Sequence, residues 1–453
     1  MNLPNYFLAD LPAEATLSAA MITEACRTLK RNRAQYLVGR TTQSVIETLC
    51  EVADQWRQPD CRFRRLALEH GVKETGFSGQ ILAAGLDAFF SHITTENLHA
   101  LITQELGHAH RLDEFVIESA ESQFKRVALA RGPDLLVHIA AGNVPNPALT
   151  SIVLGLLVRS AQFVKCATGA SLLPRLFAHS IYDTEPKLGA CLEIAEWRGG
   201  RTDLESVLYA QADCVTATGS DETLAEVRRQ LPANVRLLGY GHRVSFGFVA
   251  HEALSHFHAK RVAAHAAEDV AAWDQTGCLS PHVLYVEAGG AVSAELFAEM
   301  LAGELSQREA THPRGKLPAE HAAAIASRRV FYEVRAAASP DTRLWQSDNS
   351  TAWTIIYEAD PQFQLSCLNR FVYVKSVANL AEALKAAEPL RGKVSTVGLA
   401  TSEHRKQHLA MELARWGVTR ICPIGQMQNP PLAWRHDGRP ALGDLITWTD
   451  WEQ

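Results

Sequence analysis

The spacing of apolar residues divides the chain into two parts. From residue 13 to about residue 108, apolar positions recur at helical spacing and strand signals are few, which predicts a helical lead-in. From Val127 onward, short β-branched runs such as LLVHIAAG and FVKCAT alternate with helical segments such as DETLAEVRRQL. Strands that alternate with helices predict βαβ units and a parallel sheet, which binds its ligands beyond the carboxyl ends of the strands.

A second region of strands and helices follows, from about Arg243 to Pro423. It contains the run LSPHVLYVEAGG, a helix-rich stretch from Ala291 to Ala338, and FVYVKSVANLAEALKAAE. The last stretch is rich in Pro, Trp and Asp, which indicates an extended return or interface tail. We therefore expect an α/β protein in three parts: residues 1–242, 243–423 and 424–453.

Composition and charge exclude several classes of protein. The 453 residues carry a formal charge of −6, and 47% of them are hydrophobic. The negative charge argues against nucleic-acid binding, because domains that bind nucleic acid present a basic face. No signal peptide is evident at the N-terminus, and the longest strongly apolar stretch, Ala148 to Val158, has about half the length of a membrane-spanning helix. We therefore expect no integral membrane segment.

The cysteines indicate a reducing compartment. They are odd in number, widely spaced and free of CxxC pairs, as expected for reduced thiols in the cytoplasm. The nine positions are Cys26, Cys50, Cys61, Cys166, Cys191, Cys214, Cys278, Cys367 and Cys422.

Three loops of the first α/β region stand where a strand gives way to a helix. In AAGNVPNPAL, Asn143 can direct its amide at an oxyanion, or it can serve as a turn or N-cap residue. In FVKCATGAS, Lys165 can meet a ribose or phosphate, or remain a solvated lysine. In VTATGSDETLAEV, Gly219 and Ser220 open a helix whose free N–H groups can face a phosphate, although Ser220 also suits an N-cap. Neither a GxGxxG fingerprint nor a P-loop is present.

A fourth loop, DQTGCLSPHVLYVE, places Cys278 among Gly, Ser and Pro residues immediately before an apolar strand. A thiol there acts as a nucleophile if nearby dipoles or cations stabilise its thiolate. An isolated cysteine is more often a small buried apolar residue.

The order and spacing of these four elements resemble the aldehyde dehydrogenase superfamily. Within it the chain resembles the bacterial long-chain acyl-CoA reductases that supply aldehyde for bioluminescence, from about residue 50 to the C-terminus, including the run WRHDGRPALGDLITW. The resemblance implies two parallel-sheet, Rossmann-like domains, with the catalytic cysteine in the domain 243–423. It implies Cys278 as the nucleophile, Asn143 as the oxyanion donor, Lys165 at the adenosine ribose, and Gly219 and Ser220 under the cofactor pyrophosphate.

Two departures from the superfamily pattern are informative. Hydrolytic members carry a Glu that activates water, whereas the corresponding stretch here is LLGYGHRVSFGF, with Gly239 nearest that position. His242 lies beside it and is a plausible assistant to Cys278 in proton exchange, or else a structural or exposed histidine. NAD-preferring relatives often carry a Glu three residues beyond the lysine, whereas this chain has Thr168. Without that carboxylate a 2′-phosphate is not repelled, which favours NADPH.

The resemblance therefore implies reduction of a fatty acyl thioester, acyl-CoA or acyl-protein, to the aldehyde with NADPH through an acyl-cysteine. It also implies an acyl-activating partner enzyme and a homo-oligomer. Alternatives remain open: an acylating dehydrogenase for short-chain acyl-CoA or acyl phosphate, or a non-catalytic relative that binds cofactor. The histidines of HEALSHFHAKRVAAH suggest a metal enzyme, but no HExxH is present and we expect no metal.

Overall fold

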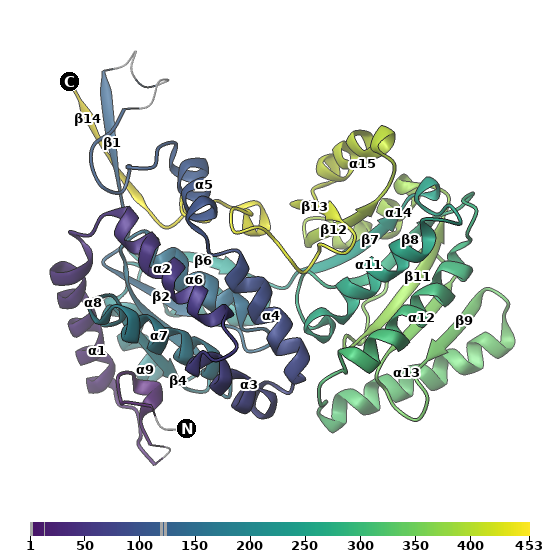
Figure 1. Ribbon diagram of the computed structural model, residues 1–453, viewed down its shortest axis with the longest axis horizontal. Coiled ribbons are helices and arrows are strands. Elements are labelled where there is room, and N and C mark those ends of the chain that lie inside the picture. Colours follow the sequence, from purple (N-terminus) through teal and green to yellow (C-terminus); the bar gives the residue numbers. More distant parts are fainter. Residues whose placement is uncertain (1–2, 13, 118–120, 122–124) are drawn as a thin grey trace.

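The computed structural model describes residues 3–12, 14–117, 121 and 125–453. It has two lobes, each built around a parallel sheet (Figure 1). Helices of the N-terminal part pack against the first sheet, which confirms the predicted helical lead-in. After the short turn η1 (Leu8–Asp10), these helices are α1 (Ala19–Asn32), the π-helix η2 (Arg33–Leu37), α2 (Thr42–Arg57), α3 (Arg62–Thr75), α4 (Gly79–Ser91) and α5 (Thr95–Leu106).

The ends of these helices follow from local sequence. Ser18, Thr41, Ser78 and Thr94 precede α1, α2, α4 and α5, and each side chain accepts a hydrogen bond from the N–H three residues on. Such caps stabilise a helix by about 1 kcal/mol each because they satisfy a free backbone donor. Helices α3 and α5 end at glycines in the left-handed conformation, a geometry that glycine adopts without strain.

The first sheet has five parallel strands in the order β4-β3-β2-β5-β6. Its strands are β2 (Leu135–Ile139), β3 (Ala161–Cys166), β4 (Leu192–Glu196), β5 (Cys214–Thr218) and β6 (Arg236–Tyr240). Its helices are α6 (Asn146–Leu157), α7 (Leu172–Thr184), α8 (Pro186–Gly189), α9 (Thr202–Gln211) and α10 (Asp221–Gln230). The chain runs outward from β2 to β4 and then returns to the other side of β2, so the strand order reverses between β2 and β5. Ligands of such sheets bind at this switch point.

The second sheet has seven strands in the order β13-β12-β7-β8-β11-β10-β9, all parallel except β9. Its strands are β7 (Val244–Val249), β8 (Pro281–Glu287), β9 (Thr342–Gln346), β10 (Thr354–Glu358), β11 (Phe371–Val377), β12 (Val394–Ala400) and β13 (Arg420–Pro423). Its helices and short turns are η4 (His251–Ala253), α11 (Ala259–Ala271), η5 (Ala272–Gln275), α12 (Ala294–Thr311), α13 (Ala319–Ala338), α14 (Leu380–Ala386), η6 (Glu388–Leu390) and α15 (Glu403–Trp416). The central strand β8 is buried throughout, as expected for a parallel strand covered on both faces.

The C-terminal segment, residues 424–453, returns from the second lobe to the first. It passes the short turn η7 (His436–Gly438) and ends in β14 (Thr447–Glu452), which pairs antiparallel with β1 (Arg126–Arg131) in an arm that projects from the first lobe (Figure 1). Arg236 at the start of β6 donates hydrogen bonds to three consecutive carbonyls of this segment. The segment is thus tied to both lobes.

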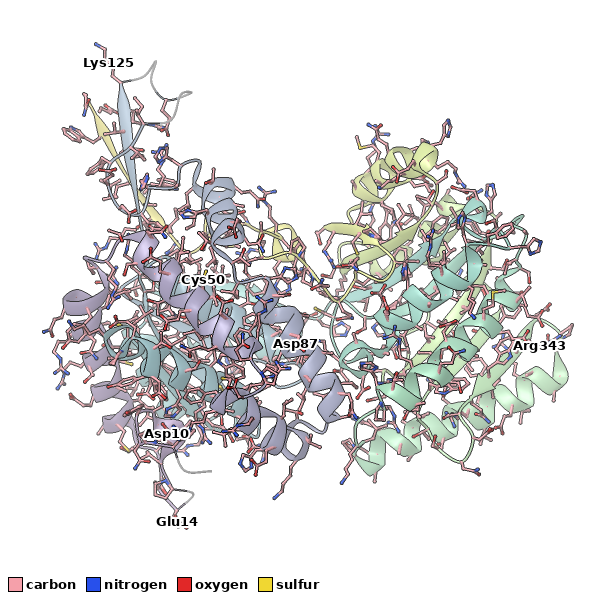
Figure 2. All side chains as sticks on the ribbon, in the orientation of Figure 1. Asp10, Glu14, Cys50, Asp87, Lys125 and Arg343 are labelled. Carbon is pink, nitrogen blue, oxygen red and sulfur yellow. The ribbon has the colours of Figure 1, made fainter. Side chains whose placement is uncertain are left out.

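Figure 2 shows Asp87 of α4 on the side of the first lobe that faces the second lobe, and Arg343 at the outer end of the second lobe. None of the helices in the described ranges has the length and apolar character that crossing a membrane requires.

Candidate active site

The loop that carries Cys278 begins with a strained turn. Trp273, Asp274 and Gln275 all have positive φ angles, 49°, 48° and 63°. Residues 368–370, before β11, form a second such run, with φ between 56° and 64°. Non-glycine residues adopt this conformation only where surrounding contacts impose it. The loop is therefore held by its neighbours and not by local preference.

Buried hydrogen bonds join the two strained turns. The Gln275 side chain accepts from the Phe371 N–H at 2.7 Å and donates to the Phe371 carbonyl at 2.8 Å. Arg370 donates to the Asp274 carboxylate at 3.0 Å, and both side chains are almost fully buried. These contacts join the turn that precedes Cys278 firmly to the turn that precedes β11.

Trp273 anchors the same loop to the helical lobe. Its ring packs edge-on against Phe77 at 5.2 Å between centroids, and it covers Gly85 of α4. A Cβ on Gly85 would lie 2.0 Å from Trp273 Cζ2, so only glycine allows this approach. The loop that carries Cys278 in the second lobe is thereby positioned by a helix of the first.

Gly85→Ala is therefore expected to destabilise the protein by roughly 1–3 kcal/mol, because the added methyl forces Trp273 out of its place. The matched control is Gly303→Ala in α12, where a Cβ meets nothing within 4 Å and the substitution should stabilise the helix slightly. Urea unfolding of both variants measures the difference. Equal stability of the two variants would contradict the anchoring role of Trp273.

Cys278 lies between η5 and β8, half-buried, at the point where the lobes meet. Its carbonyl accepts a hydrogen bond from the Ser245 hydroxyl of β7 at 2.7 Å. Asn143 approaches from the first lobe and donates its side-chain amide to the Thr276 carbonyl at 3.0 Å. A Cβ on Gly277 would lie 3.8 Å from Val144 Cγ2. The structure thus brings Asn143 into contact with the loop that carries Cys278. The two bonded residues, Asn143 and Thr276, are 133 positions apart in the sequence.

The thiol of Cys278 is held in its neutral form. Desolvation is the largest cause of a rise in its pKa to about 12, the Asp437 carboxylate adds to the rise, and Arg243 acts in the opposite direction. A thiol with such a pKa is protonated near neutral pH.

The loops that carry the predicted site residues of the first lobe lie at the switch point of the first sheet, and Lys165 lies on the neighbouring strand β3. Asn143 follows β2, and Gly219 and Ser220 follow β5, so the two loops flank the reversal of strand order. Ser220 is the N-cap of α10 and accepts from the Thr223 N–H at 3.2 Å. The N-cap interpretation of Ser220 thus holds, and the same helix end remains suited to an anion.

Lys165 lies on β3 and is buried, with its ammonium 5.8 Å from the centre of the Trp197 ring. Burial lowers its pKa, and the carboxylates Glu205 and Glu196 act against that effect. Thr168 is exposed in the turn that follows, and the Glu196 carboxylate accepts the neighbouring Gly169 N–H at 2.8 Å. Lys165 is therefore not a solvated surface lysine.

His242 is exposed, and its backbone N–H donates to Asp221 at 3.2 Å. Its charge acts on buried His282, four residues beyond Cys278, whose pKa is lowered to about 4 mainly by burial. A Cβ on Gly239 would point at Leu224 of α10, at 3.2 Å. Position 239 therefore faces α10.

Sequence reasoning missed several residues around Cys278. Ser245 and Arg243 lie at the start of β7, and Asp437 and Gln428 belong to the C-terminal segment; Gln428 donates to Ser280 at 2.6 Å. Arg243 and Ser245 lie in the run LLGYGHRVSFGF, and Asp437 lies in the run WRHDGRPALGDLITW. Both runs stood out in the sequence, but these three residues were assigned no role.

The histidine-rich stretch does not converge on one site. His251 bonds to Glu287 at 2.7 Å, and the group His251, Glu252 and Glu287 has the spacing of metal ligands. Arg405 donates to both of these carboxylates, at 2.7 Å to Glu252 and 2.6 Å to Glu287. This donor set is thus engaged by a guanidinium.

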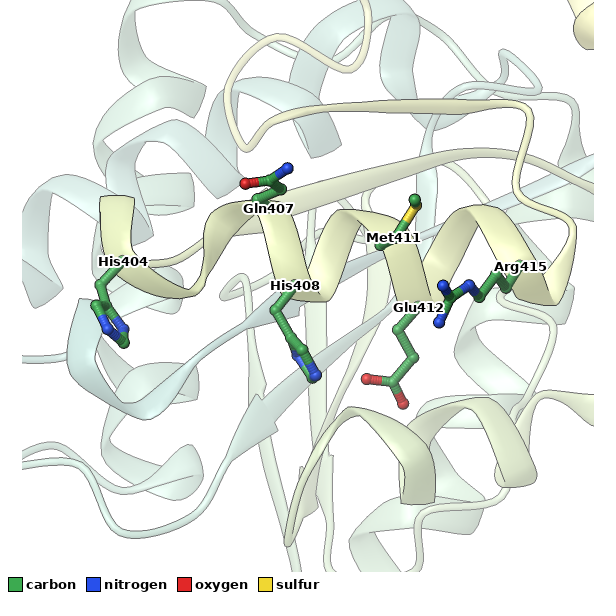
Figure 3. A pocket seen from close by; sticks show the side chains of 6 residues that line it. All are labelled: His404, Gln407, His408, Met411, Glu412 and Arg415. Carbon is green, nitrogen blue, oxygen red and sulfur yellow. The ribbon is translucent and has the colours of Figure 1, made fainter.

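A separate surface hollow runs along the exposed side of α15 and is lined by side chains of that helix (Figure 3). Its lining residues are His404, Gln407, His408, Met411, Glu412 and Arg415. None of them contributes to the surroundings of Cys278 described above.

Comparison with solved structures shows the fold. The chain superimposes on a variant of proline utilization A from Bradyrhizobium japonicum with a TM-score of 0.73 and 16% identity, covering 96% of this chain and 45% of that one. It thus spans less than half of that protein. An NAD-dependent benzaldehyde dehydrogenase from Corynebacterium glutamicum gives a TM-score of 0.69 and 12% identity, covering 97% of this chain and 91% of that one. The protein has the aldehyde dehydrogenase fold, as predicted.

Comparison with families and curated relatives shows more. The model of the family "Acyl-CoA reductase (LuxC)" matches residues 38–448. A long-chain acyl-protein thioester reductase of Vibrio harveyi is 22% identical over 426 residues, 92% of this chain and 84% of that one. The corresponding reductase of Aliivibrio fischeri is 23% identical over 425 residues, 92% of this chain and 83% of that one. The chain belongs to the acyl-CoA reductase family. The predicted reaction class, reduction of a fatty acyl group to an aldehyde by an oxidoreductase, is confirmed.

Proposed function

We propose that the chain reduces a long-chain acyl thioester with NADPH through an acyl intermediate on Cys278. The observation that carries this proposal is the convergence of Asn143 and the Cys278 loop, with the Asn143 amide 3.0 Å from the Thr276 carbonyl. A small rotation of that amide away from the carbonyl directs its N–H groups toward an oxygen bound beside the thiol. Such a donor, placed where negative charge develops, is typically worth on the order of a hundredfold or more in rate.

In the first half-reaction, the Cys278 sulfur attacks the acyl carbonyl and the new C–S bond forms. Asn143 donates to the resulting oxyanion, and the bond to the donor's sulfur breaks. The proton of the Cys278 thiol leaves on the departing thiolate, so charge is conserved. His242, which is exposed beside the site, is proposed to pass a proton from solvent to the Cys278 thiolate that forms when the aldehyde leaves.

The first lobe is proposed to hold the nicotinamide cofactor. Lys165 would contact the adenosine ribose, and Gly219 and Ser220 would lie under the pyrophosphate at the N-terminus of α10, because both groups lie at the carboxyl ends of strands near the switch point. When bound, the cofactor supplies the hydride that reduces the acyl-cysteine. Collapse of the reduced adduct would then release the aldehyde and a Cys278 thiolate, which takes up a proton to restore the thiol.

NADPH is expected to be used at least as well as NADH, because Thr168 places no carboxylate against a 2′-phosphate. Steady-state kcat/KM values for the two cofactors measure the preference. The control variant Thr168→Glu should shift the ratio toward NADH by about tenfold, or 1.4 kcal/mol. A tenfold preference of the unaltered enzyme for NADH would contradict the prediction and would make Glu196, the carboxylate bonded at this turn, the residue to test next.

The function is tested by cofactor oxidation with acyl-CoAs of graded chain length and with an acyl phosphate. Turnover that increases toward long acyl chains supports the proposal. Preference for a short-chain acyl-CoA or an acyl phosphate would favour another acylating dehydrogenase. Cofactor binding without turnover would indicate a non-catalytic relative.

We further propose an acyl-activating partner enzyme as the source of acyl groups, and a homo-oligomer. The oligomer is supported by the projecting β1–β14 arm, on which Trp448 and Trp451 are 47% and 53% exposed. A cytoplasmic location is supported by the cysteines, all nine of which are free thiols. We place the boundary between the cofactor-binding and catalytic domains at residues 242 and 243, between β6 and β7.

A further inference from the structure

The C-terminal segment returns a carboxylate to the neighbourhood of Cys278. Asp437 lies in the turn η7 with a positive φ of 53°, and its side chain is only 4% exposed. One of its oxygens accepts from Arg243 Nε at 3.1 Å, and the other accepts from the Ser395 hydroxyl at 3.3 Å. A left-handed aspartate with both oxygens bonded is held in one place.

The residues that hold Asp437 are neighbours of those that hold Cys278. The Ser245 hydroxyl donates to the Cys278 carbonyl at 2.7 Å and accepts from the Thr396 N–H at 3.1 Å. Arg243 stands two residues before Ser245, and Ser395 is adjacent to Thr396. Ser245, Ser395 and Thr396 lie at the beginnings of β7 and β12, Arg243 immediately precedes β7, and Cys278 precedes β8. These three strands are consecutive in the second sheet, in the order β12-β7-β8. Cys278 and Asp437 thus share one end of this sheet.

We infer that Asp437 and Arg243 are a charged pair that adjusts the reactivity of Cys278 within its buried site: the carboxylate disfavours the thiolate, and the guanidinium supports it. The inference rests on the proposed role of Cys278 as the nucleophile. Asp437 also binds Arg243 directly, which weakens the support that this cation gives to a thiolate. The two residues are positioning residues, since no reacting atom bonds to them.

The electrostatics of the site agree with this geometry. Burial is the largest cause of the raised pKa of the Cys278 thiol; the Asp437 carboxylate raises this pKa further, and the Arg243 guanidinium lowers it. The neighbouring histidines add little charge at neutral pH: burial lowers the pKa of His436, which stacks on Tyr240 at 4.6 Å, and that of His282. His242 is exposed to solvent. A neutral resting thiol also resists oxidation, because the thiolate is the form that oxidants attack.

The test is the rate at which iodoacetamide alkylates Cys278 between pH 7 and pH 9, followed by peptide mass spectrometry on the full chain. Asp437→Asn keeps the shape of the side chain and one of its two hydrogen-bond acceptors, so the alkylation rate at pH 8 should rise by about tenfold or more, the effect of one pKa unit. Arg243→Gln should lower the rate. The matched control is Asp444→Asn, on the same segment, whose carboxylate accepts from Arg439 at 2.8 Å.

The double variant Asp437→Asn with Arg243→Gln is the control for misfolding. Removal of both charges should return the alkylation rate of Cys278 toward that of the unaltered enzyme, whereas a folding defect would not be reversed by a second substitution. If Cys278 were alkylated at the same rate in Asp437→Asn and in Asp444→Asn, the inference would be overturned. An increase in the alkylation rate of the same size in all variants would also overturn it. Failure of the proposed function has a different signature: acyl transfer from a labelled thioester would persist without Cys278, whatever the alkylation rates.

Discussion

Replacing Cys278 by alanine is expected to abolish reduction, with a loss of at least about a thousandfold in kcat/KM, because no acyl-cysteine can form. Binding of cofactor should remain nearly intact, since the switch point of the first sheet lies in the other lobe. Incubation with radioactive acyl-CoA should label the unaltered enzyme and leave the variant unlabelled.

Cys166 and Cys214 serve as controls for this experiment. Both are fully buried in the first sheet, and burial raises the pKa of Cys166 to about 12 and that of Cys214 to about 11. Their replacement by alanine should leave the labelling unchanged. Equal labelling of the unaltered enzyme and Cys278→Ala would assign the nucleophile to another cysteine.

The elements of the fold could be predicted because local patterns specify them. The alternation of apolar strands and amphipathic helices indicated parallel sheets, and Ser220 before an acidic first turn marked the start of α10. The pairing of β1 with β14 was not predictable in this way, because its register joins Arg126 to Glu452 and no local signal connects two segments so far apart.

The site was predictable only where a motif carried it. Asn143 and Cys278 could be proposed as site residues because each lies in a recognisable loop, and the structure places the two loops in contact. The left-handed turn at residues 273–275 left no signal, because Trp, Asp and Gln do not favour positive φ and the turn exists through contacts with Phe371 and Arg370. The Arg243–Asp437 pair joins residues 194 positions apart, and charged residues in loops are ordinary at the level of sequence.

Oxidation of aldehyde to free acid is expected to be slow, because we expect none of the described residues to activate water beside Cys278. In that direction an acyl group accumulates on Cys278 and must be removed before the next turnover. Position 239, nearest to the hydrolytic Glu of relatives, is glycine and faces Leu224, and both oxygens of Asp437 are engaged by Arg243 and Ser395. Without a placed base, hydrolysis loses a factor of about 10²–10⁴.

Aldehyde and NADP⁺ alone should therefore give a burst of about one reduced cofactor per active site, followed by little turnover. Adding coenzyme A should restore steady turnover, since a thiol near its pKa attacks the acyl-cysteine without a placed base. Rapid-quench measurement of reduced cofactor, with and without coenzyme A, separates the burst from the steady state. Steady formation of acid at full rate without any thiol would place the enzyme among hydrolytic aldehyde dehydrogenases. The base would then be sought at exposed His242, whose replacement by Gln should in that case remove the acid-forming turnover and leave the burst.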